Sequence, residues 1–174
     1  MREPVYLLGA YLCNDDGGSL TAALSCFERG RKLHWRDTPR PVKRRVCQVI
    51  GGHEASHIIV AAAPLADGIR EERARQRALA TLVAILAGDY AVSALVLERR
   101  QHAQDMKDQA TLKAMRQGGA APAVFTLSHE YGAGEPRLWV PDQVIGAYGD
   151  ALEGDARAWG HLAHRVRVEH VSLA

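Results

Sequence analysis

The feature that most constrains the fold of this chain is the alternation of short apolar segments with longer segments of helical spacing. The apolar segments span residues 5–12, 58–63, 92–97, 123–127 and 166–171. Several are β-branched and end at proline or turn residues, as buried strands do. The segments of helical spacing span residues 19–29, 39–49, 69–88, 105–117, 141–152 and 155–164. Strands that alternate with helices predict an α/β fold with a mostly buried sheet.

Length and composition suit a single compact unit. The chain has 174 residues and no Ser-, Pro- or Gly-rich linker, so we expect one domain over residues 1–174. No apolar stretch reaches the roughly 18 residues of a membrane span, and no signal-peptide pattern opens the chain. We therefore expect a cytoplasmic protein with no membrane partner. Three cysteines without metal-site spacing predict free thiols rather than disulfides.

The charge of the chain is concentrated in one window, from Phe27 to Val46. The whole chain has a net charge of only +2, but this window has eight basic residues against two acidic ones, a net charge of +6. Such a window suits DNA or RNA, because basic side chains neutralise phosphates and an aromatic ring stacks on a base. The alternative is a solvated helix face with a core tryptophan. The candidate nucleic-acid-binding residues are Arg31, Lys32, Trp35, Arg36, Lys43, Arg44 and Arg45.

Carboxylates at the ends of predicted elements form the second candidate site. Glu98 closes an apolar strand, at the edge where α/β sheets place their ligands. Asp142 precedes the apolar face of a predicted helix, and Asp37 lies in the basic window. Carboxylates that converge from separate elements can hold Mg²⁺ or Mn²⁺ beside a scissile phosphate. The alternatives are a helix-capping role for Asp142 and an exposed ion pair for Glu98.

A third candidate is the sequence His53-Glu54-Ala55-Ser56-His57, which matches the H-E-x-x-H pattern of zinc hydrolases. On a helix, both histidines would bind zinc from one face and Glu54 would polarise the bound water. Two glycines precede the motif and an apparent strand follows it, which favours a turn leading into a strand.

Five segments in chain order carry a resemblance to a known family. They are Tyr6-Leu7-Leu8-Gly9-Ala10, Leu33-His34-Trp35-Arg36-Asp37, His57-Ile58-Ile59-Val60, Leu95-Val96-Leu97-Glu98-Arg99, and residues 138–147. Together they resemble an actinobacterial branch of a large bacterial family of unknown function with a ribonuclease H-like, retroviral integrase-type fold. The last segment is the most specific, because Asp142 opens an apolar helix and Gly146 follows four residues later.

The resemblance implies a mixed sheet flanked by helices and metal-dependent hydrolysis of phosphodiester bonds. Its middle element falls on His34 to Asp37 and its late aspartate on Asp142, while Glu98 occupies an acidic strand end. The family's Asp-Glu-Ser strand would precede Tyr6, and it is absent here. The resemblance therefore implies a sheet that lacks its first strand. Either the coding sequence starts further upstream, or a second copy or a partner protein completes the sheet, or the metal chemistry has been lost.

The leading hypothesis is a nuclease that uses Mg²⁺ or Mn²⁺ and acts on DNA or RNA. Glu98, Asp142 and Asp37 are the candidate catalytic residues, and Glu98 and Asp142 are the candidate metal ligands. One alternative is a catalytically inactive binding or assembly protein of the same fold, as a homo-oligomer or with a partner protein. The other is the zinc hydrolase with His53, Glu54 and His57.

Overall fold

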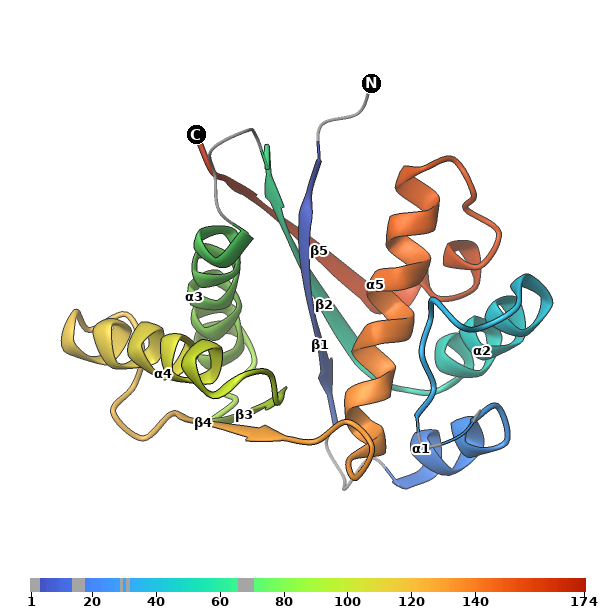
Figure 1. Ribbon diagram of the computed structural model, residues 1–174, viewed down its shortest axis with the longest axis horizontal. Coiled ribbons are helices and arrows are strands. Elements are labelled where there is room, and N and C mark those ends of the chain that lie inside the picture. The colour runs from blue at the N-terminus through green and yellow to red at the C-terminus, as the bar shows by residue number, and fades with distance from the viewer. Residues whose placement is uncertain (1–3, 14–17, 29, 31, 66–70) are drawn as a thin grey trace. The chain divides into compact units, whose positions relative to one another are not determined.

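The computed structural model describes residues 4–13, 18–28, 30, 32–65 and 71–174. The strands in this part of the chain are β1 (Tyr6–Leu12), β2 (Ser56–Ala63), β3 (Ala94–Glu98), β4 (Thr126–Glu130) and β5 (Val166–Ser172). The α-helices are α1 (Gly18–Ser25), α2 (Arg40–Gly52), α3 (Glu71–Asp89), α4 (His102–Gln117) and α5 (Trp139–Leu152) (Figure 1). Three 3-10 turns are η1 (Pro136–Leu138), η2 (Trp159–His161) and η3 (Ala163–Arg165). The predicted mixed α/β class is confirmed.

The strands form two sheets, one of three strands and one of two. The first has the order β1-β2-β5, with β2 in the centre. The central position explains why β2 is buried without interruption from His57 to Ala62. In the second sheet β3 and β4 are parallel, and Glu98 lies opposite Glu130 in the register.

The chain folds into two compact units. The first unit contains residues 1–8, 60–131 and 168–174, and the second contains residues 9–59 and 132–167.

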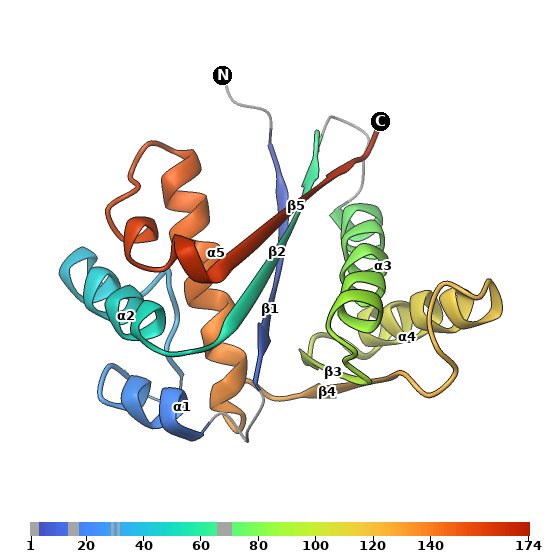
Figure 2. The same ribbon diagram turned by 180° about the vertical axis from the view of Figure 1, so that it is seen from behind.

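The first unit contains α3, α4 and the β3–β4 sheet, and α4 is the crossover that joins the two parallel strands (Figure 2). The predicted apolar stripe of α3 is confirmed, because Leu79, Leu82, Val83 and Leu86 are all buried. The strand predicted at residues 123–127 is instead Thr126–Glu130. Phe125 is fully buried just before β4, so part of the apolar signal of this segment comes from outside the strand, while Leu127 is buried within it.

The second unit contains α1, α2, α5 and the 3-10 turns, and α2 contacts α5. Helix α2 buries Val46, Cys47 and Ile50. The helix predicted over residues 155–164 does not form, and this segment contains the 3-10 turn η2 and most of η3 instead. Gly160 lowers the helix propensity there, and Ala158 and Leu162 supply the buried side chains.

Candidate functional site

In the second unit, the first turn of α5 holds the loop that precedes α2. The Asp142 Oδ2 accepts a hydrogen bond of 2.9 Å from the Trp35 backbone N–H. The neighbouring Gln143 donates its Nε2–H to the Leu33 carbonyl oxygen at 3.2 Å. The His34 Nδ1 lies 3.7 Å from the same Asp142 oxygen. The structure therefore brings two of the predicted segments together, with Asp142 as their link.

Trp35 is a packing residue in this loop. Only 7% of its surface is exposed. A Cβ atom added to Gly146 would fall inside the contact distance of the indole ring, so glycine is what lets the ring lie against α5. Lys43 lies on α2, and its Nζ is 4.3 Å from the centroid of the Trp35 ring. The base-stacking role predicted for Trp35 does not fit this environment, because the ring is covered by its neighbours.

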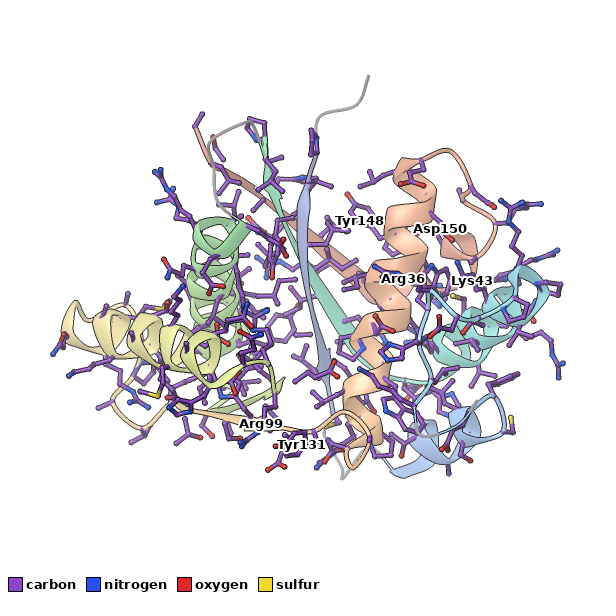
Figure 3. The ribbon with its side chains drawn as sticks, viewed as in Figure 1. Arg36, Lys43, Arg99, Tyr131, Tyr148 and Asp150 are labelled. Carbon is purple, nitrogen blue, oxygen red and sulfur yellow. The ribbon has the colours of Figure 1, made fainter. Side chains whose placement is uncertain are left out.

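Lys43 also pairs with a carboxylate of the protein. Its Nζ forms an ion pair of 3.2 Å with the Asp150 Oδ2, and only 15% of the lysine side chain is exposed (Figure 3). An ammonium group that already faces a carboxylate and an indole ring is a poor phosphate ligand. The structure therefore corrects the prediction for Lys43, which links α2 to α5.

The remaining basic residues of the window divide by exposure. Lys32 is half-buried and already interacts with another group of the protein. Arg31 lies outside the described residues. Arg36, Arg40, Arg44 and Arg45 are all exposed. The Arg45 guanidinium lies 5.4 Å from the centroid of the Phe27 ring. We call these four residues the α2 basic face, since three lie on α2 and Arg36 lies in the loop just before it.

The three candidate catalytic carboxylates, of which Glu98 and Asp142 are the predicted metal ligands, lie on separate elements. Asp37 is exposed in the loop, where its backbone N–H donates to the His34 carbonyl oxygen at 3.2 Å. Asp142 is partly exposed on α5, in the same unit. Glu98 is exposed at the end of β3, in the first unit and opposite Glu130. The structure therefore places Asp142 beside His34 and Glu98 beside Glu130.

The H-E-x-x-H motif does not lie on a helix. His53 follows the last turn of α2, and its Nδ1 lies 2.8 Å from the Val49 carbonyl oxygen. His57 is the second residue of β2 and stacks on Tyr11, with ring centroids 5.5 Å apart. Two histidines on one helical face are what the zinc hypothesis required, and this geometry does not provide them. The alternative, a turn leading into a strand, is confirmed.

His57 is an isolated buried imidazole. It is 1% exposed, and within the described part of the chain neither ring nitrogen has a hydrogen-bond partner. Burial and, to a smaller extent, the charge of Arg165 together lower the pKa of His57 to about 4. The neutral ring is therefore the form that the folded protein favours.

The first unit contains a group of side chains with metal-ligand chemistry that the sequence did not indicate. Asp105, Asp108 and His129 offer ligand atoms that all lie within 4.8 Å of one another. Asp105 and Asp108 lie on α4 and His129 lies on β4. Two carboxylates and an imidazole can ligate a divalent cation.

Arginines already occupy the positions that a cation would take in this group. Arg75 donates two hydrogen bonds of 2.9 Å to the two oxygens of Asp108. Arg100 donates to the Asp108 Oδ1 at 3.1 Å and forms an ion pair with Glu72, and the His129 Nε2 lies 3.0 Å from the Asp108 Oδ2. We call these five residues, together with Asp105, the Asp108 network. Its geometry is that of a buried cross-link between α3, α4 and β4, and it does not fit a metal centre well.

The electrostatics of Asp108 agree with this role. Burial by itself raises the pKa of the carboxyl group, but the hydrogen bonds from Arg75 and His129 and the charges of both arginines lower it below the ordinary value. Asp108 therefore stays ionised although it is fully buried. The sequence offered little signal for this, because α4 has the composition of a polar surface helix and Arg75 comes 33 residues before Asp108.

Comparisons of the chain with protein-family models, with curated proteins and with solved structures found no match. Among the helices of the described residues, none combines the length and the apolar character needed to cross a membrane. The function is therefore argued from the residues of the two units themselves.

Proposed function

We propose that this protein binds nucleic acid through the α2 basic face. The observation that carries the proposal is the different environment of neighbouring cations. Lys43 forms an ion pair with Asp150, whereas Arg36, Arg40, Arg44 and Arg45 are exposed. Guanidinium groups are well suited to phosphate, because their planar fork of donors matches two phosphate oxygens.

The spacing on α2 supports contact with a continuous backbone. Arg40 and Arg44 are four residues apart, so they lie on the same side of the helix, one turn from each other. The loop that carries Arg36 is fastened to α5 by the hydrogen bond between Trp35 and Asp142. The basic face is thus built on anchored elements, which reduces the entropy lost when it binds.

The test is the fluorescence anisotropy of labelled DNA and RNA, single-stranded and duplex, at several salt concentrations. Four neutralised phosphates predict that the logarithm of the association constant falls against the logarithm of salt concentration with a slope of about −3 for single strands. The double variant Arg40→Gln/Arg44→Gln should bind about tenfold more weakly, with a slope reduced to about half.

The matched control removes two exposed basic residues from the first unit, as Arg73→Gln/Lys113→Gln. This variant has the same net charge as the first, so affinity close to that of wild type is the expected result. An equal loss in both variants would show that overall charge, and not the α2 basic face, determines binding. No binding to any of the nucleic acids would overturn the proposal.

The ribonuclease H-like nuclease is a second candidate within the same proposal. It is favoured by the contact of two segments of the family resemblance, residues 33–37 and 138–147, through Asp142. Addition of Mg²⁺ or Mn²⁺ to the binding assay tests it, with Asp142→Asn as the variant that should stop cleavage. Binding without cleavage would support the catalytically inactive binding protein instead.

A further inference from the structure

Tyr131 presents an aromatic ring on the surface of the first unit. It directly follows β4, and 68% of its surface is exposed. The Arg99 guanidinium lies 5.0 Å from the centroid of the ring (Figure 3). With so much of its surface accessible, the ring cannot be covered on both faces. We call this pair the Tyr131 platform.

The carboxyl ends of two parallel strands hold the platform in position. The Arg99 backbone N–H donates to the Glu130 carbonyl oxygen at 2.8 Å, which continues the pairing of β3 with β4 by one residue. The Arg99 Nη2 donates to the His129 carbonyl oxygen at 3.1 Å. The next residue, Arg100, belongs to the Asp108 network beneath. The guanidinium is therefore positioned by backbone and buried contacts before any ligand arrives.

We infer that the Tyr131 platform stacks on an unpaired base of a nucleic acid strand, an inference that rests on the proposed nucleic-acid binding. An exposed aromatic ring beside an arginine offers the surface on which bases of single strands stack. The carboxylates of Glu98 and Glu130 end the neighbouring strands, so the charge around Arg99 does not favour phosphate. Recognition at this place is therefore expected to come from the base and not from the backbone.

Tyr131 differs in exposure from Trp35, the stacking residue predicted from the sequence. Trp35 is buried in the second unit, whereas Tyr131 in the first is mostly exposed. Bases within a duplex already stack on each other, so only an unpaired base can use the platform. The inference therefore predicts that single strands gain affinity from Tyr131 and that duplexes do not.

The test compares Tyr131→Ala with Tyr131→Phe by anisotropy of a labelled oligothymidine of about 12 nucleotides, a length within the site sizes of single-strand binders. The alanine variant should bind about tenfold more weakly, because a stacked base contributes that order of affinity. The phenylalanine variant keeps the ring and should bind within about twofold of wild type. Tyr90→Ala, which removes another exposed tyrosine of the same unit, is the matched control and should bind like wild type.

Two further probes make the result specific to a base. Tyr131→Ala should leave the affinity for duplex DNA, and for a single strand of the same length with abasic sites, unchanged. An equal loss on these probes, or no loss on oligothymidine, would overturn the stacking inference and leave the α2 basic face in place. If wild type binds no nucleic acid, the proposed function fails, and this inference fails with it.

Discussion

The arginines of the two units differ in their surroundings. In the first unit Arg75 and Arg100 turn inward, where their guanidinium groups meet the fully buried Asp108. In the second unit the arginines of the α2 basic face are exposed, and among the basic residues of α2 it is Lys43 that pairs with an acid, Asp150. The difference lies in the partner, because a guanidinium is buried only where a carboxylate is buried with it. The number of arginines in a segment therefore says less about function than the acids that the fold brings to them.

The two aspartates at the centre of these units differ in the same way. Asp108 accepts hydrogen bonds from charged side chains, and its loss would leave the Arg75 guanidinium without its carboxylate partner and Arg100 with Glu72 alone. Asp142 accepts from a backbone N–H and remains partly exposed. Asp108 should therefore determine the stability of its unit, whereas Asp142 should determine the position of one loop.

The largest expected effect comes from Asp108→Ala. Because this change leaves Arg75 and Arg100 facing a cavity, the free energy of unfolding should fall by about 3–5 kcal/mol. Urea denaturation followed by circular dichroism measures it. Lys107→Ala, one residue earlier on α4 and exposed, is the matched control and should change stability by less than about 0.5 kcal/mol. A loss below about 1 kcal/mol for Asp108→Ala would contradict the view of the network as a cross-link of the first unit.

The second expected effect is a dependence of stability on pH that comes from His57. Unlike Asp108, His57 is buried without a hydrogen-bond partner among the described residues. The pKa of His57 is about 4 in the folded protein and about 6.5 in the unfolded chain. Its contribution to stability is therefore present above pH 6.5 and is lost as the pH falls toward 4, by up to about 3 kcal/mol. The pKa of Asp108 is also lowered, so its contribution is lost only in more acidic solution, below the ordinary aspartate pKa of 3.8.

Urea denaturation at several pH values between 7 and 4 measures this dependence. His57→Phe keeps an aromatic ring against Tyr11 but cannot be protonated, so its stability should change less over this range. The same pH dependence in wild type and His57→Phe would show that other groups cause the loss.

The smallest effect is expected at Asp142. Asp142→Ala removes the acceptor of the Trp35 backbone N–H, which should cost about 1–2 kcal/mol and shift tryptophan emission as the loop loosens. Asp142→Asn keeps an oxygen that can accept this hydrogen bond, so it should lie closer to wild type in stability. Equal losses in the two variants would mean that the charge of Asp142, and not its hydrogen bond, holds the loop.

Much of the secondary structure could be predicted from the sequence, because local patterns determine it. The apolar run before Pro64 became the central strand β2, and the stripe from Leu79 to Leu86 became the buried face of α3. The prediction failed at residues 155–164, where Gly160 and two short turns replace a helix. It also misplaced β4, because an apolar residue such as Phe125 can be buried from a turn as well as from a strand.

The candidate sites were predicted less well than the elements that carry them. The basic window was found from charge alone, but amino-acid type did not show which of its residues are paired inside the protein and which are exposed. Lys43 and Arg44 are adjacent in sequence, yet the first faces Asp150 and the second faces solvent. Tyr131 was not singled out, because nothing local distinguishes an exposed tyrosine after a strand from a buried one.

The sequence by itself determined the α/β class, the order of the main strands and helices, and the concentration of charge between Phe27 and Val46. These features follow from periodicity and composition over short stretches of chain. Only the tertiary structure decided which charges are neutralised, because Arg75 and Asp108, or Lys43 and Asp150, meet across long intervals of sequence. Burial raises the cost of an unpaired charge, so buried arginines occur with the acids that the fold brings to them, while the arginines of the α2 basic face stay exposed.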